Sequence, residues 1–203
     1  MSSSEGPPDD LLALIADAHD EAFRQVTGKW RAYRGLVRTP AGGTFFPSEV
    51  RALAAAFTAL GLAGRVLEVG SGDGRLLSLL AHLRPAALPG IAEVVGVEVV
   101  PEYVEASRRA RVLLEEQIDY GATREICANV LEVDLAAFDV LLYFAGGAMP
   151  EAEDAKFREK LARELRPDAR LVAWGPDAEE IDLPRLAAAP VPGYHTLHVY
   201  RGR

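Results

Sequence analysis

Short, mostly apolar segments alternate with longer segments of helical periodicity along most of the chain. The predicted strands are Arg65–Val69, Glu93–Glu98, Asp139–Phe144 and Arg170–Trp174, with a weaker one at Glu125–Ala128. The predicted helices between them are Asp73–His82, Pro101–Gln117 and Glu153–Leu165. Strands without polar alternation are buried on both faces. The pattern therefore predicts an α/β fold with a doubly wound, mostly parallel sheet and helices on both faces.

Two further helices are expected before this alternation begins. The first follows Asp9 and Asp10, which suit a helix cap, and runs to about Tyr33. Its apolar positions recur at helical spacing, at Leu11, Leu14, Ile15, Ala18, Ala22, Val26 and Trp30. We expect this stripe to pack on the main core, and a lid over a substrate site is the alternative.

The second of these helices is expected to begin at Pro47 and Ser48 and to end at Gly61 and Gly64. A loop over Arg38–Thr44 precedes it, because that segment contains a proline and two glycines. The apolar face of the helix consists of Val50, Leu53, Ala54, Phe57 and Leu60.

The last part of the chain departs from the alternation of strands and helices. Ile181–Ala189 and His195–Arg201 have no long helix between them, which predicts a hairpin and an antiparallel edge strand. The expected organisation is a disordered tail at 1–9, N-terminal helices at 10–62 that pack on the core, and a main region at 63–203. Together they predict a single globular domain.

Composition narrows the class of protein. The chain has 203 residues, 49% apolar and 26% charged, with a net charge of -8, which argues against a nucleic-acid partner. The single cysteine, Cys127, is expected to be a buried thiol in a reducing compartment. No motif suggests a metal site, and no apolar run approaches the roughly 20 residues of a membrane span. The expected location is therefore cytoplasmic, because the start also lacks a signal-peptide pattern.

The main chemical signal is the segment Gly70-Ser71-Gly72-Asp73-Gly74, between a predicted strand and a predicted helix. Glycine at such a turn permits positive φ and lets a ligand approach the backbone. A tight turn without a ligand is the alternative, but three alternate glycines exceed what a turn needs. In a doubly wound sheet, ligands bind beyond the carboxyl ends of the strands, where this segment lies.

The residues around the glycines indicate which ligand binds. A dinucleotide fingerprint requires glycine or alanine where this chain has Arg75, and the Gly-Lys-Ser/Thr ending of a phosphate loop is absent. Glu68 lies two residues before the first glycine, where a carboxylate would repel a phosphate but attract an ammonium or sulfonium. S-adenosylmethionine carries both cations and no phosphate. We therefore predict that the cofactor is S-adenosyl-L-methionine.

Two further strand ends complete the expected cofactor site. Glu98 ends the second strand, and its carboxylate suits the two hydroxyls of a ribose. Asn129 follows the third strand and is expected to contact an adenine edge. Val99 and Val130, next to these two residues, are expected to contact the cofactor as well.

These motifs together resemble those of the class I, Rossmann-like methyltransferases. Glu68–Arg75 is similar to their first motif. Within that superfamily the chain most resembles the small protein-lysine methyltransferases that modify the ATP synthase c subunit or an adenine nucleotide carrier. Three segments carry this resemblance: Phe45-Phe46-Pro47, Gly96–Pro101 and Glu164–Leu171. Two positions depart from the family pattern, because Asn129 replaces an acid and Leu131 replaces an aromatic residue.

The resemblance implies an S-adenosylmethionine-dependent methyltransferase with a Rossmann-like fold, and protein-lysine N-methylation as its reaction. It also implies that Phe45 helps to cover the donor methyl group. The alternative is that the rings of Phe45 and Phe46 only pack the next helix against the core. A small-molecule methyltransferase and a noncatalytic cofactor-binding module remain as alternatives. The sequence identifies no general base, and Glu49 and Asp139 are the candidates that it offers.

Overall fold

The computed structural model describes residues 9–28, 37–38, 44–147 and 149–203. Within them, one sheet of seven strands has the order β5-β4-β3-β6-β7-β9-β8. The strands are β3 (Gly64–Val69), β4 (Ile91–Glu98), β5 (Thr123–Cys127), β6 (Val140–Phe144), β7 (Arg170–Trp174), β8 (Arg185–Ala189) and β9 (Leu197–Arg201). All pairs from β5 to β7 are parallel, and β9 runs antiparallel to both of its neighbours. The mostly parallel sheet and the C-terminal hairpin are therefore as the sequence predicts.

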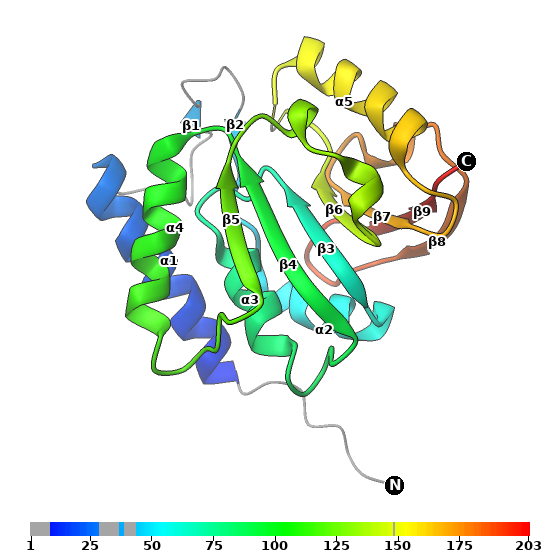
Figure 1. The fold of residues 1–203 in the computed structure, drawn as a ribbon. Coiled ribbons are helices and arrows are strands. Elements are labelled where there is room, and N and C mark those ends of the chain that lie inside the picture. The colour runs from blue at the N-terminus through cyan, green and yellow to red at the C-terminus, as the bar shows by residue number, and fades with distance from the viewer. Residues whose placement is uncertain (1–8, 29–36, 39–43, 148) are drawn as a thin grey trace, which may run out of the picture.

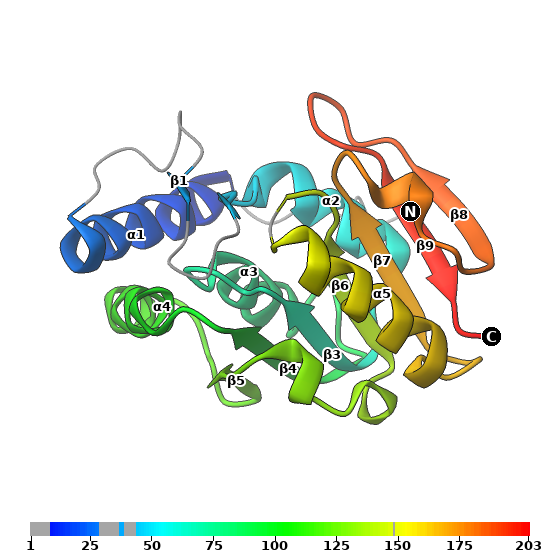
Figure 2. The same ribbon diagram turned by 90° about the horizontal axis from the view of Figure 1, so that it is seen from above.

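Helices cover both faces of this sheet. One buried cluster joins the strands to four helices, which are α1 (Asp9–Thr27), α2 (Val50–Leu60), α3 (Arg75–Leu83) and α4 (Pro101–Leu114). Beside this cluster, α1 also packs against α4. The fifth helix, α5 (Glu151–Glu164), packs through Phe157 and Leu161 in a second cluster on the opposite face. In Figures 1 and 2, α1 runs beside α4 at one end of the molecule and α5 lies toward the other end.

The first helix is shorter than its sequence pattern suggests. It ends at Thr27, because Gly28 adopts a left-handed φ of 67° that stops the helix. The remainder of the predicted helix, to Tyr33, lies outside the described residues, as does most of the predicted tail at 1–9. Asp9 is already the first residue of α1. Leu14, expected in the packed stripe, is 40% exposed.

The third helix begins later than expected, at Arg75 instead of Asp73. Gly74 is its N-terminal cap with a φ of 78°, and a left-handed residue cannot continue a helix. The fourth helix, α4, ends earlier than expected, at Leu114 instead of Gln117. Strand β4 begins two residues earlier than predicted, at Ile91. These shifts leave the order and type of the predicted elements unchanged.

The predicted loop over Arg38–Thr44 has paired ends. Strand β1 (Val37–Arg38) pairs antiparallel with β2 (Thr44–Phe45), with Arg38 opposite Thr44. Residues 39–43 lie outside the described residues. Strand β2 lies near the ends of β4 and β5 (Figure 1).

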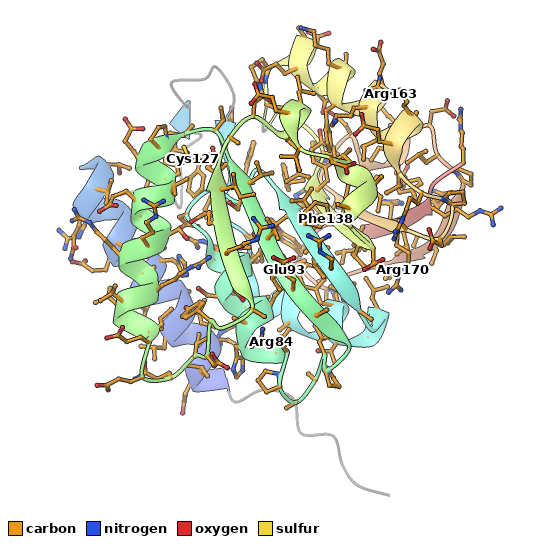
Figure 3. The ribbon with its side chains drawn as sticks, in the orientation of Figure 1. Arg84, Glu93, Cys127, Phe138, Arg163 and Arg170 are labelled. Carbon is orange, nitrogen blue, oxygen red and sulfur yellow. The ribbon has the colours of Figure 1, made fainter. Side chains whose placement is uncertain are left out.

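The expectation of a buried thiol is wrong, because Cys127 is exposed. It is the last residue of β5, which is the outermost strand on its side of the described sheet. Figure 3 labels it at the end of that strand. Within the described part of the chain, no helix combines the length and the apolar character that crossing a membrane requires.

Candidate functional site

A cavity opens at the carboxyl ends of the parallel strands. It encloses about 1070 Å³ of empty space, including its open mouth. The predicted cofactor residues that line it are Glu68, Gly70, Ser71, Gly72, Asp73, Glu98, Val99, Asn129 and Val130. Gly74 lies behind the loop instead, where a β-carbon would approach the Ser107 hydroxyl to 2.0 Å.

The glycine loop is folded tightly onto the end of β4. The amides of Gly70 and Ser71 both donate to the carbonyl oxygen of Val97, at 2.9 and 3.0 Å. All three glycines have positive φ, at 68°, 56° and 78°. A β-carbon on Gly70 would meet no atom of the described residues within 4 Å, so this glycine leaves its backbone open on that side. This is the close backbone approach that a ligand needs.

Glu98 is held by backbone amides at the mouth of the loop. Its Oε2 accepts from the amide of Gly72 and its Oε1 from the amide of Val100, both at 2.9 Å. The side chain is buried, and this burial raises the pKa of the carboxyl despite the two amide donors. Each carboxylate oxygen has a second acceptor site, so both remain able to accept from hydroxyl groups of a ligand.

Glu68 is buried with one unused oxygen. Within the described residues, its Oε2 accepts no hydrogen bond, although the residue is only 5% exposed. Burial, together with the charges of Glu125, Asp73 and Glu98, raises the pKa of this carboxyl well above its usual range. A buried carboxylate without a partner is costly. A cation placed in the cavity would remove that cost.

Asp73 is held by an arginine that follows it in the loop. Its carboxylate accepts from Nε of Arg75 at 3.0 and 3.1 Å, and both side chains are buried. Burial alone would raise the pKa of Asp73, but the charge and hydrogen bonds of Arg75 outweigh it and lower the pKa. The dinucleotide fingerprint has glycine or alanine at this position, and neither could form the ion pair that Arg75 makes with Asp73.

The sequence alone did not single out Glu125, on β5. Its Oε1 accepts from the Ser71 hydroxyl at 3.0 Å, so this hydrogen bond connects the glycine loop to β5. Burial, more than any neighbouring charge, raises the pKa of Glu125 to about 7. An isolated acid in a weak strand gave no signal of this role, since Ser71 lies 54 residues earlier.

Asn129 caps the short 3₁₀ helix η1 (Val130–Glu132) at the floor of the cavity. Its side-chain oxygen accepts from the amide of Leu131 at 2.9 Å, which fixes the orientation of the side-chain amide. Val130 is buried beside it, whereas Val99 on the opposite side is 46% exposed. The three residues present one polar and two apolar groups to the cavity.

Phe45 closes one side of the cavity. Its ring stacks on Phe23 of α1, with centroids 4.7 Å apart, and contacts Tyr103 of α4 at 5.0 Å. The ring is only 7% exposed, yet Phe45 and Tyr103 both line the cavity. The ring packs on α1 and α4 rather than on the helix that follows it, which was the packing partner expected from the sequence. The expected role of Phe45 in covering the donor methyl group stays a prediction.

A second aromatic group forms the far wall. Phe46 stacks on Phe144 at 4.9 Å, and Phe144 meets Trp174 edge to face at 6.3 Å. All three residues line the cavity, with Glu153 of α5 nearby. Among the described residues, the acidic and basic side chains of the lining are Glu68, Asp73, Glu98, Glu153 and Arg75, and Arg75 is already paired. The cavity therefore favours a positively charged ligand.

The geometry does not support either acid that the sequence offered as a base. Asp139 precedes β6 at the opposite edge of the sheet, where the amide of Arg65 donates to it at 2.7 Å. Hydrogen bonds from that amide and from the Arg166 guanidinium lower the pKa of Asp139, which suits a structural ion pair. Glu49 is exposed and is not part of the lining.

Solved structures with the same fold are known, although the sequence matches no protein-family model and no curated protein. A point mutant of MtNAS in complex with S-adenosylmethionine is 19% identical and has a TM-score of 0.60. The match covers 95% of this chain and 73% of that one. An RNA methyltransferase from Salinibacter ruber in complex with S-adenosyl-L-homocysteine is 17% identical, with a TM-score of 0.56, over 77% of this chain and 93% of that one.

A third structure with this fold is an O-methyltransferase of neocarzinostatin biosynthesis in complex with S-adenosylmethionine and a naphthoic acid. It is 15% identical and has a TM-score of 0.53, over 72% of this chain and 50% of the other. The likenesses show that this chain has the Rossmann-like methyltransferase fold.

Proposed function

We propose that this protein is an S-adenosylmethionine-dependent methyltransferase. The observation that carries the proposal is the Oε2 of Glu68, which is buried and has no hydrogen-bond partner among the described residues. It lies beside a glycine loop that leaves its backbone open. This pair of features fits a ligand that is positively charged and carries no phosphate. The three neighbouring structures with this fold, each in complex with S-adenosylmethionine or S-adenosyl-L-homocysteine, support the same cofactor.

In this proposal each part of the cavity contacts one part of the cofactor. Glu98 accepts from the ribose hydroxyls, and Asn129 with Val130 contacts the adenine, beside Val99. Glu68 and the loop from Gly70 to Asp73 face the charged methionine end. Residues 63–203 then form the cofactor-binding region and residues 10–62 the helices that pack on it.

The bound cofactor would supply a methyl group on a sulfonium. The acceptor lone pair would attack the methyl carbon in line while the methyl–sulfur bond breaks, and S-adenosyl-L-homocysteine would leave. The chain's own contribution is alignment, which by itself supplies much of the acceleration in such reactions. Phe45 and Tyr103 form one wall of the approach and exclude water from it. An amine acceptor must be neutral to react. Desolvation by the apolar rings lowers the pKa of an amine and so favours that form, whereas the acids of the lining favour the ammonium form in which the amine would first bind.

The acceptor that the site supports best is an amine, and we propose a protein lysine side chain. Four acids and one paired arginine are the acidic and basic groups that the described residues bring to the lining, so the cavity would repel an anionic acceptor. Aromatic faces such as those of Phe46 and Trp174 attract ammonium groups before they lose their proton.

A small aromatic acceptor is the second candidate, because the Phe46–Phe144 pair offers a flat surface for stacking. Cell extract incubated with isotope-labelled S-adenosylmethionine separates the two by mass spectrometry, since label enters either a protein or a small molecule. Calorimetry with S-adenosylmethionine, S-adenosyl-L-homocysteine and NAD tests the cofactor first. Binding of NAD without a response to either methyl compound would overturn the proposal.

A further inference from the structure

Helix α1 carries a buried polar residue on its apolar face. His19 is fully buried, although α1 packs mainly through apolar side chains such as Ile15 and Ala22. An aliphatic side chain would pack there without the cost of burying an imidazole. Its hydrogen-bond partners therefore account for the presence of a histidine.

The histidine bonds directly to the glycine loop. Nδ1 of His19 lies 2.7 Å from the carbonyl oxygen of Asp73, and Nε2 lies 2.8 Å from the Ser78 hydroxyl. A carbonyl oxygen only accepts, so Nδ1 carries the proton and Nε2 accepts from Ser78. The Ser78 oxygen in turn accepts from the Tyr120 hydroxyl at 2.8 Å. Tyr120 thus donates to Ser78, Ser78 donates to His19, and His19 donates to the carbonyl oxygen of Asp73.

The imidazole stays neutral in this position. Burial lowers the pKa of His19 to about 4, although the neighbouring Asp73 carboxylate opposes this shift. Arg75 and Arg111 add to the lowering through their positive charges. At neutral pH the direction of the hydrogen-bond chain is therefore fixed.

The next residue of α1 holds the same loop by a second route. Asp20 accepts from Nη2 of Arg75 at 3.1 Å, and Arg75 also binds the carboxylate of Asp73. The backbone and the side chain of Asp73 are thus both connected to α1. On the other side of the loop, Glu98 accepts from the amide of Gly72.

These contacts fix one peptide plane. With the Asp73 carbonyl directed at α1, the following amide, of Gly74, points the opposite way and donates to the Ser71 carbonyl at 2.8 Å. Gly72, between these two bonds, lies in the cavity lining. The left-handed conformation of Gly72 therefore depends on a peptide that α1 orients.

We propose that α1 is a positioning element for the cofactor, which acts through His19 and Asp20 on the glycine loop. The inference rests on the proposed function for the identity of the ligand, and on the contacts above for the role of α1. Neither residue lines the cavity, so each acts through Asp73 and Arg75 rather than by touching the ligand.

Two substitutions of His19 separate positioning from packing. The side-chain amide of asparagine reaches the place of Nδ1, and that of glutamine reaches the place of Nε2. His19→Asn therefore keeps the bond to Asp73, whereas His19→Gln keeps only the bond to Ser78. Calorimetry with S-adenosyl-L-homocysteine should show binding weakened about tenfold by His19→Gln and less than about twofold by His19→Asn.

Ser78→Ala is the matched control, because it removes the partner of Nε2 and leaves the bond to Asp73. It should lower the midpoint of thermal unfolding and leave the affinity unchanged. Asp20→Asn, at a side chain that is 35% exposed, tests the second route if a His19 variant fails to fold. It should weaken binding about threefold, as expected for one weakened ion pair.

Failure of the wild-type protein to bind S-adenosyl-L-homocysteine would count against the proposed function and not against the role of α1. If the wild type binds, equal affinity of folded His19→Gln and His19→Asn would reduce His19 to a packing residue. Unchanged affinity in Asp20→Asn would likewise overturn the positioning role of Asp20.

Discussion

Phe45 lies directly over Gly72. A β-carbon on Gly72 would approach Cε2 of Phe45 to 2.7 Å, closer than such atoms come in proteins. The glycine is therefore required twice, by its φ of 56° and by the ring above it. The contact also joins the loop after β3 to the segment before α2, so that the two halves of the cavity wall fit only if this residue has no side chain.

Gly72→Ala should weaken cofactor binding strongly, because the new methyl group must displace either Phe45 or the loop. The positive φ should also cost about 1 kcal/mol of stability. Calorimetry with S-adenosyl-L-homocysteine and thermal unfolding measure the two effects separately.

Gly193→Ala is the control for that substitution. Gly193 has a φ of 72° but no atom within 4 Å of its would-be β-carbon, and it lies between β8 and β9. It should lose similar stability and no affinity. Similar affinities for the two variants would show that Phe45 moves aside freely.

Phe45→Leu should lower methyl transfer more than it lowers stability. Leucine fills much of the space between Phe23 and Tyr103, at a cost of about 1–2 kcal/mol, but it leaves a gap in the cavity wall. Alanine is a poorer probe, because removing a buried ring costs about 3–5 kcal/mol by itself. Turnover with labelled donor is the measurement.

Phe57→Leu is the reference for this comparison, since Phe57 is fully buried and does not itself line the cavity. It packs edge to face against Trp174, which does line the cavity. Its loss of stability should match that of Phe45→Leu while turnover stays near normal. If the two variants lose turnover equally, the ring of Phe45 acts only as packing.

Glu98→Gln should bind the cofactor about tenfold more weakly than the wild type, a loss of roughly 1.4 kcal/mol. Both oxygens of Glu98 accept backbone amides, so the glutamine NH₂ must face either Gly72 or Val100, donor against donor. Titration calorimetry gives the loss. A ligand without ribose hydroxyls should then lose less affinity in this variant than in the wild type, and an equal loss would assign the ribose to another residue.

Raising the pH from 6.5 to 7.5 should destabilise the ligand-free protein through Glu125. Below pH 6.5 His19 opposes this effect, because burial lowers its pKa to about 4 and its folded form binds fewer protons than the unfolded one. The carboxyl of Glu125 keeps its proton up to about pH 7 in the folded state but has a usual pKa of 4.5. The folded state therefore binds more protons between these values, and its stability falls as the pH rises. Thermal midpoints across this range provide the measurement.

Glu125→Gln should flatten that pH profile, because the amide oxygen still accepts from Ser71 but does not titrate. Other acids contribute to the profile, including Glu68, whose pKa is also raised. A profile as steep in the variant as in the wild type would remove Glu125 from this explanation.

The sequence predicted those features that depend on neighbours along the chain. Arg170–Trp174 is a strand as expected, and the residues before the glycines lie at the strand end where ligands bind. The start of α3 was placed two residues early, because composition alone does not show that Gly74 is left-handed.

The contacts that support the loop were not predictable in the same way. His19 bonds to residues 54 and 59 positions away, so no local pattern identifies its partners. A polar residue on the apolar stripe of α1 was the one signal available. Asp139 remained a candidate base in the sequence for the same reason, since Arg65 and Arg166 meet it only in the folded sheet.

The place of β9 in the sheet sets an order for its assembly. Strand β8 precedes β9 in the chain, but in the described sheet it is joined to β7 only through β9. Most residues of β8 are exposed, so little apolar burial holds the strand in place by itself. Strand β8 should therefore be the first strand of the sheet to open and the last to close. Such opening would expose its amides to hydrogen exchange while the strands from β5 to β6, and the cavity at their ends, remain closed.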